Sequence, residues 1–128
     1  MNYEVIFSPF TERHFIKSFI RKYKGAWNNT VRGLIVEFTL FDSLFLRSTA
    51  ETIVDTGDVK VCKTEFKIAG TPESRHGSGN RCIVAVHKSA RKVCVLLVYG
   101  KTDIRGGNET AGWKALVRGN YPEYANIL

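Results

Sequence analysis

Residues 81–99 read RCIVAVHKSARKVCVLLVY, and this stretch decides the fold. Its first part, residues 81–87, alternates and predicts a strand with even-numbered positions on one face and odd-numbered positions on the other. Residues 89–91 predict a turn. Residues 93–99 are apolar on both faces, which is typical of a strand in the centre of a sheet. Two such strands joined by a short turn predict an antiparallel hairpin.

A further strand is expected before this hairpin, in residues 59–68. One face of this strand carries Cys62, Phe66 and Ile68, and the other carries Lys63, Glu65 and Lys67. Residues 70–80 read GTPESRHGSGN, a composition that predicts a loop. The three strands together predict an antiparallel meander.

Helices are expected both before and after the meander in the chain. After a short strand in residues 3–7, Ser8 and Pro9 form a helix start for residues 11–24, which carry a basic outer face and end at Gly25. Apolar residues at helical spacing predict a second helix up to Phe45, capped near Asn28. Asn108 can cap a last helix that reaches Arg118.

The predicted order is therefore β-α-α-β-β-β-α, an α+β fold with an antiparallel sheet. A helical hairpin is expected to cover one sheet face. The other face is expected to be open and to carry Lys63, Arg81 and His87. With 128 residues, the chain is expected to form one domain, residues 1–128.

The formal net charge of +7 favours an anionic partner: nucleic acid, an acidic protein or an anionic membrane. No spanning segment is expected, because Glu37 and Asp42 interrupt the longest apolar run, residues 34–46. The N-terminus lacks the basic region of a signal peptide. These features predict a cytoplasmic protein without a membrane partner.

The three cysteines, Cys62, Cys82 and Cys94, lie inside apolar runs without CxxC spacing. They are expected to be buried thiols in a reducing compartment. No His/Cys pair has the spacing of metal ligands, so neither a metal site nor a cofactor is expected.

The element order and several short motifs resemble the RelE/ParE toxin superfamily, and most closely its HigB-like branch of mRNA interferases. The motifs are Phe66-Lys67-Ile68 after Lys63, the glycine-rich loop that runs into residues 79–84, and the strand of residues 93–101 that ends Tyr99-Gly100-Lys101. The resemblance covers most of the chain and is best from residue 59 to residue 103. It implies a RelE-like fold and a toxin of a type II toxin–antitoxin system.

In such enzymes the ribose 2′-OH attacks the adjacent phosphate without a metal, which leaves a 2′,3′-cyclic phosphate. The resemblance implies a ribosome-dependent cut in mRNA, a block of translation and neutralisation by a cognate acidic antitoxin. The catalytic candidates are Arg81, which can hold two phosphate oxygens, Tyr99, Lys101 and His87. The candidates for binding RNA are Lys60, Lys63, Lys67 and Arg75.

Each candidate also has a plainer interpretation. Arg81 can be an ordinary cation at a strand end, and Lys63 and Lys67 can be solvated with Glu65 as their partner. Tyr99 can belong to the edge of the core, and His76 can be a solvated loop residue. Two other functions stay open: a non-enzymatic relative that inhibits a protein such as DNA gyrase, and a plain RNA-binding module.

Overall fold

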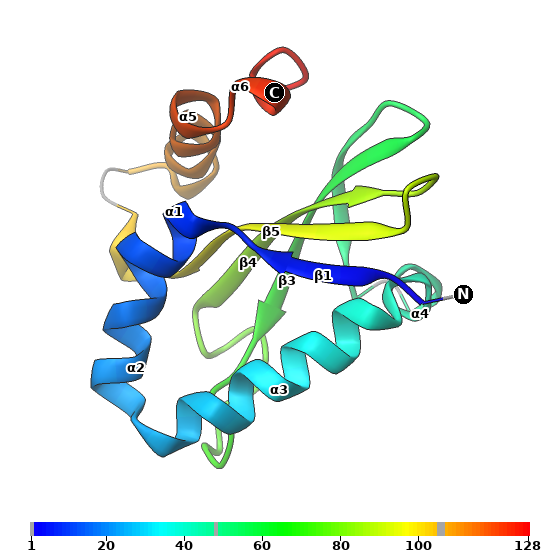
Figure 1. Cartoon of the computed structure of the whole chain (residues 1–128). Coiled ribbons are helices and arrows are strands. Elements are labelled where there is room, and N and C mark those ends of the chain that lie inside the picture. The colour runs from blue at the N-terminus through cyan, green and yellow to red at the C-terminus, as the bar shows by residue number, and fades with distance from the viewer. Residues whose placement is uncertain (1, 48, 105–106) are drawn as a thin grey trace.

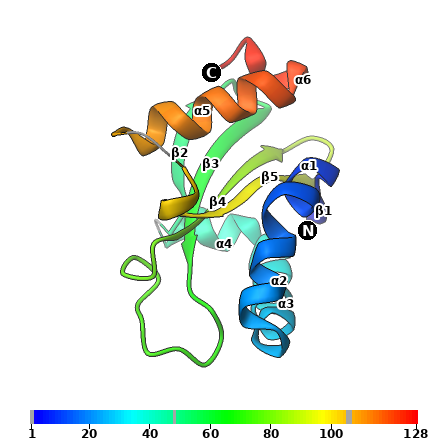
Figure 2. The same cartoon turned by 90° about the vertical axis from the view of Figure 1, so that its left-hand side faces the viewer.

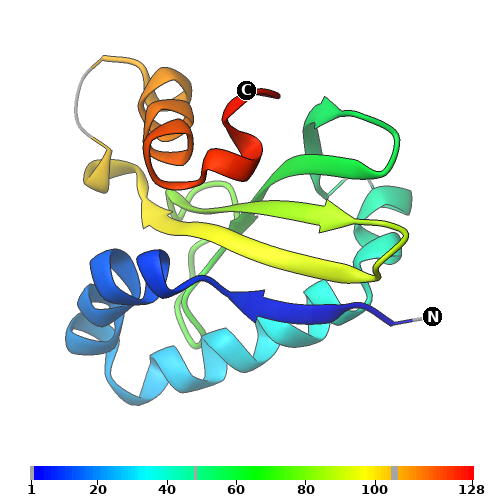
Figure 3. The same ribbon diagram turned by 45° about the horizontal axis from the view of Figure 1, so that its top comes forward.

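A five-stranded sheet with the strand order β1-β5-β4-β3-β2 forms the centre of the molecule (Figure 1). The computed structural model describes residues 2–47, 49–104 and 107–128, apart from the side chain of Lys101. The strands are β1 (Glu4–Phe7), β2 (Glu51–Asp55), β3 (Val59–Phe66), β4 (Asn80–His87) and β5 (Lys92–Gly100). The α+β class and the antiparallel meander β3-β4-β5 are confirmed. The sheet is nevertheless mixed, because β1 runs parallel to β5 (Figure 3).

The strand β2 is absent from the predicted order. It pairs antiparallel with β3 through a tight turn in which Gly57 adopts a φ of +97° and its N–H donates to Asp55 Oδ1 at 2.8 Å. Asp55 and Gly57 are turn residues of the expected kind, but the half-exposed strand before them is too short to show a clear alternation.

The first helical segment begins as predicted, with Ser8 Oγ accepting a hydrogen bond from the Thr11 N–H at 3.1 Å. It consists of α1 (Pro9–Thr11), a π-helical turn η1 (Glu12–Ile16) and α2 (Lys17–Tyr23). The predicted stop at Gly25 is wrong by one residue. Lys24 breaks the helix with a φ of 49°, and Gly25 already begins the next helix.

The second predicted helix is two helices, α3 (Gly25–Thr39) and α4 (Phe41–Leu46), which are separated at Leu40. The helices α2 and α3 lie against one face of the sheet (Figures 1 and 2). The core between these helices and the sheet contains fully buried residues from both layers, among them Phe38, Phe41, Leu44, Cys62, Val84 and Val95.

The opposite sheet face is not open as predicted, because two C-terminal helices cover much of it (Figure 3). They are α5 (Glu109–Asn120), capped by Asn108 as expected, and α6 (Pro122–Ala125), which lies beyond the last helix that the sequence predicts. Trp113 and Val117 of α5 are fully buried against this face. A register shift opposite Ile83 and Val84 turns both Leu96 and Leu97 toward this core. The valines of β5 face the other core, so β5 is apolar on both faces because each face is covered.

Within the described residues, no helix is long and apolar enough to cross a membrane.

Candidate functional site

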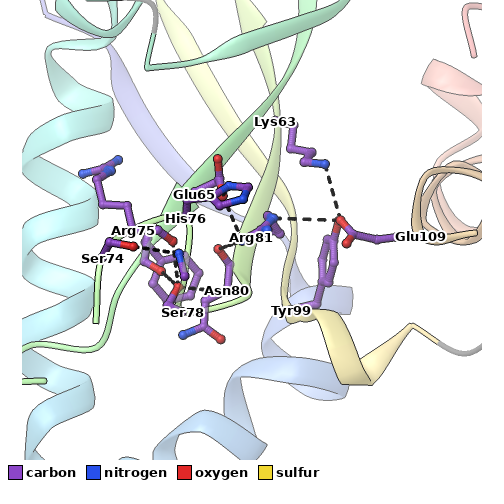
Figure 4. A network of polar contacts seen from close by, with 12 residues as sticks. Lys63, Glu65, Ser74, Arg75, His76, Ser78, Asn80, Arg81, Tyr99 and Glu109 are labelled. Atoms are coloured by element: carbon purple, nitrogen blue, oxygen red, sulfur yellow. Dashed lines mark hydrogen bonds and ion pairs between the residues drawn. The ribbon is translucent and has the colours of Figure 1, made fainter. Parts of the chain in front are cut away.

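A network of charged and polar side chains lies where β3 ends and β4 begins, on the sheet face that α5 adjoins (Figure 4). Its members are Lys63 and Glu65 of β3, His76 of the loop between the strands, Arg81 of β4, Tyr99 of β5 and Glu109 of α5. We refer to these six residues as the Arg81 cluster. The alternation of β3 and β4 places Lys63, Glu65 and Arg81 on one face, as the sequence predicts.

Arg81 is the central cation of the cluster and is buried, with its side chain only 9% exposed. It stands opposite Glu65 in the antiparallel pairing of β3 and β4. Its Nη1 lies 3.1 Å from Glu65 Oε2 and also donates to the Asn80 carbonyl at 3.2 Å. The guanidinium is therefore held in one orientation.

A second carboxylate reaches Arg81 from the opposite side. Glu109 stands in the first turn of α5, and its Oε2 lies 4.0 Å from Arg81 Nε and 3.4 Å from Lys63 Nζ. Burial on its own favours the neutral acid. The hydrogen bond from Tyr99, followed by the charges of Lys63 and Arg81, nevertheless holds the pKa of Glu109 below its ordinary value.

Tyr99 is fully buried and donates its hydroxyl proton to Glu109 Oε2 at 2.8 Å. Burial, the hydrogen bond and the nearby negative charge all raise the pKa of its phenol. Tyr99 thus stays a neutral donor, and its ring offers no exposed face on which a base can stack. The interpretation as a core residue describes its position better than the stacking role does.

One donor in the cluster is unused. Arg81 Nε is buried and has no hydrogen-bond acceptor among the described residues, since Glu109 at 4.0 Å is too distant. A buried donor without an acceptor is unfavourable by about 1–3 kcal/mol. An oxygen atom that came close to Nε would satisfy it.

His76 joins the cluster from the loop. Its Nδ1 lies 2.7 Å from Glu65 Oε2, and its side chain is 85% exposed. A carboxylate at Nδ1 favours the tautomer with the proton on that nitrogen, which leaves Nε2 free to accept a proton. Glu65 therefore contacts both an oriented imidazole and an oriented guanidinium.

The loop that carries His76 is tied to its surroundings. Arg75 forms a two-pronged ion pair with Glu37 of α3, in which Nη2 donates to Oε1 at 3.0 Å. Ser78 Oγ donates to the Phe66 and Arg75 carbonyls and accepts from the Asn80 N–H at 3.1 Å. These contacts connect the loop to both the helical layer and the start of β4.

The other predicted site residues lie elsewhere. Lys60 is on the opposite sheet face, with its Nζ 4.7 Å from the centre of the Phe45 ring. Lys67 follows the end of β3 and donates to the Thr71 carbonyl at 3.4 Å. His87 shares a face with Arg81 but stands at the far end of β4, where its Nε2 lies 2.7 Å from the Tyr124 hydroxyl. The side chain of Lys101 lies outside the described structure.

The structure thus brings Lys63, Arg81 and Tyr99 together and holds Arg75 in the adjoining loop. It does not bring Lys60, Lys67 or His87 to them. The sequence indicates a solvated strand face for Glu65 and a loop position for His76, and it indicates no role for Glu109. Glu65 could have been found from its place on the same strand face as Lys63, whereas nothing local to Glu109 indicates that α5 folds back onto β4.

No group of three or more His, Cys, Asp or Glu side chains suited to a metal ion occurs in the described ranges. The cluster has instead the parts of acid–base chemistry: a carboxylate, an imidazole, a buried guanidinium and an ammonium group.

The chain matches no known protein-family model, no curated protein and no solved structure.

Proposed function

We propose that the protein is a metal-independent endoribonuclease of the RelE/ParE toxin type, which cuts mRNA on the ribosome and stops translation. One observation carries the proposal: the Glu65 carboxylate contacts the imidazole of His76 and the guanidinium of Arg81 at once. These are the groups that a transesterification of RNA needs, namely a base for the 2′-OH and a cation for the phosphate.

His76 is the proposed general base. Glu65 holds the proton on Nδ1, so that Nε2 takes the proton of the ribose 2′-OH. The 2′-oxygen then bonds to phosphorus while the bond from phosphorus to the 5′-oxygen breaks. The products are a 2′,3′-cyclic phosphate and a 5′-hydroxyl, and Lys63 is the proposed donor of the proton that the 5′-oxygen takes up.

Arg81 is the proposed phosphate ligand, through the Nε that has no acceptor among the described residues. Glu109 stands 4.0 Å from this atom and carries the same sign of charge as a phosphate. Binding of the phosphate therefore requires Glu109 to move away from Arg81. A phosphate oxygen at hydrogen-bond distance from Arg81 Nε would then replace the Glu109 carboxylate at 4.0 Å.

The toxin context comes from the resemblance of the motifs and from the net charge of +7. Its proposed partners are the ribosome with mRNA and a cognate acidic antitoxin in the cytoplasm. The exposure of His76, whose side chain is 85% accessible, supports dependence on the ribosome, because a ribosome can align the mRNA with this base before the chemical step.

The decisive experiment incubates the purified protein with naked RNA and with programmed ribosomes and maps the RNA ends. Cyclic phosphate ends with ribosomes, and little cutting of naked RNA, are expected. Chelator is added only to the naked-RNA arm, where it should not reduce residual cleavage. His76→Gln should lose cleavage, whereas His14→Gln, an exposed histidine of η1, should keep it.

Growth provides a second test. Expression of the protein alone should arrest growth, and co-expression of its antitoxin should relieve the arrest. Normal growth at verified expression of folded protein would count against the toxin proposal.

A non-enzymatic relative that binds a protein target is the second candidate. The observation that favours it is the charge balance of the cluster, in which Lys63 and Arg81 face two carboxylates, Glu65 and Glu109. Growth arrest by His76→Gln and by wild type to the same extent, without new RNA ends, would select this candidate.

A further inference from the structure

We propose that a cleft between α2 and the loop before β4 binds one nucleobase of single-stranded RNA, and that the cations of α2 bind the phosphates beside it. The inference rests on the proposed function and extends it to substrate recognition. It adds a base-specific site outside the Arg81 cluster.

The cleft has a volume of about 310 Å³, which suits a small ligand. Its walls come from four parts of the chain: α2, the loop before β4, the ends of β4 and β5, and the 3-10 turn η2 (Lys101–Asp103). The lining residues include Lys22, Tyr23, Glu73, Asn80 and Asp103.

Asn80 is the polar group that most strongly indicates a ligand. It is only 8% exposed, yet its carboxamide has no hydrogen-bond partner within the described ranges. The side chain lies over Gly100, where an added Cβ would stand 3.3 Å from Asn80 Oδ1. The carboxamide is not one of the buried polar groups that lack a partner, since it reaches solvent through the cleft. Its free edge offers one donor and one acceptor group, which the edge of a nucleobase could pair with together.

The remaining walls suit a flat base with N–H donors. Tyr23 is partly exposed and lies parallel to the buried Phe19, with 6.1 Å between their ring centres. Aromatic rings of this kind stack on bases. Glu73 and Asp103 add carboxylates that only accept hydrogen bonds, which favours guanine, with its N1–H and N2–H₂ groups, over uracil.

The phosphate-binding part is the exposed side of α2 and the segment around it. Arg13, Lys17, Arg21 and Lys24 are all exposed, and none forms an ion pair with a described residue. They contrast with Lys63 and Arg81, whose charges are paired with carboxylates. Lys22 joins the two parts, because it lines the cleft and its Nζ lies 5.2 Å from the centre of the Tyr23 ring.

The cleft is close in the chain to the proposed catalytic groups. Asn80 immediately precedes Arg81, and one loop supplies Ser78 to the cleft and His76 to the Arg81 cluster. Because side chains alternate along a strand, Asn80 and Arg81 point to opposite faces of the sheet. RNA that occupied both the cleft and the Arg81 cluster would therefore pass around the start of β4.

The experiment measures binding without cleavage. Fluorescein-labelled 2′-O-methyl RNA lacks the attacking hydroxyl, and two oligomers are compared by anisotropy: nine uridines, and the same oligomer with guanosine at the centre. Wild type should bind the guanosine oligomer about tenfold more tightly. Asn80→Ala and Asn80→Asp should both lose this preference, because their affinity for the guanosine oligomer should fall more than their affinity for nine uridines.

The cations are tested with charge-matched double variants. Lys17→Gln with Arg21→Gln should weaken binding at least tenfold and lower the salt slope by about 1.4, since each phosphate contact on a single strand contributes about 0.7. Lys88→Gln with Lys92→Gln, at the far β4–β5 turn, should change neither value.

Equal losses in the two double variants, or an unchanged guanosine preference in both folded Asn80 variants, would overturn the proposal. Thermal melting establishes that each variant is folded. Base-specific binding by a wild-type protein that cuts no RNA would leave this site standing and remove the nuclease. RNA cleavage that is unchanged in the Lys17/Arg21 variant would leave the nuclease proposal standing and remove this binding site.

Discussion

Glu65 and Arg81 stand directly opposite each other on β3 and β4, with Glu65 Oε2 3.1 Å from Arg81 Nη1. The pair joins β3, which carries Lys60, Lys63 and Glu65, to β4, in which Arg81 is the one residue among Asp, Glu, Lys and Arg. It keeps the guanidinium rigid, and it also means that the cation expected on an open surface is buried and neutralised.

Glu109→Gln should strengthen RNA binding and raise the cleavage rate. The change removes a negative charge 4.0 Å from Arg81 Nε, while the amide oxygen can still accept the Tyr99 proton. Relief of about 1 kcal/mol of repulsion corresponds to roughly fivefold in affinity. The measurements are the dissociation constant for RNA and the single-turnover cleavage rate. A fall in both would show that Glu109 helps the reaction instead of blocking the phosphate.

Arg81→Lys should keep the fold and lower cleavage by about two to three orders of magnitude, because an ammonium group cannot replace the planar guanidinium. Arg81→Ala should in addition destabilise the protein by about 3 kcal/mol, since Glu65 and Glu109 lose their shared cation. Arg32→Lys, on the exposed side of α3, is the matched control. Denaturant unfolding and cleavage are measured on the same preparations. Full activity of Arg81→Lys would exclude a role for the guanidinium.

Stability should fall at acid pH partly through Glu109. The pKa of this carboxyl is below its ordinary value of 4.5 in the folded protein, so the folded state binds its proton less tightly than the unfolded state does. Its stabilising contribution is complete above the unfolded pKa and is lost as the pH falls through the folded pKa. The difference in melting temperature between wild type and Glu109→Gln should therefore be constant near neutrality and shrink below about pH 4.5. The control is Glu51→Gln on β2, whose difference from wild type should be small throughout; a Glu109 difference that grows in acid would contradict the prediction.

Arg75→Gln should reduce cleavage more than it reduces stability. The Arg75–Glu37 pair is partly exposed, with side chains 39% and 24% accessible, so its loss should destabilise the fold by only about 0.5 kcal/mol. The same pair holds the loop that presents His76, and its loss should slow cleavage several-fold. Glu37→Gln should have the same effect, and the double variant should be no worse than either single variant. Additive losses of activity would show that the two residues act independently.

The sequence alone determined the elements whose pattern is local. Alternation in residues 59–68 and 81–87 assigned the correct faces to Cys62, Lys63 and Arg81, because a strand repeats every two residues. Ser8 with Pro9, and Asn108, marked true helix starts, because a cap needs only its own first turn. The ends of the helices could not be predicted to the residue, because the helices break at Lys24 and Leu40, which are neither glycine nor proline. The strand β2 could not be predicted because it is only five residues long.

Only the tertiary structure decided what surrounds those faces. The parallel pairing of β1 with β5, the cover that α5 provides, and the contact of Glu109 with Arg81 join residues far apart in the chain. Such contacts depend on how apolar faces are buried against one another, and no local period records that choice. The sequence therefore established which residues share a strand face, whereas burial decided that Arg81 would be a paired cation and α2 an unpaired basic surface.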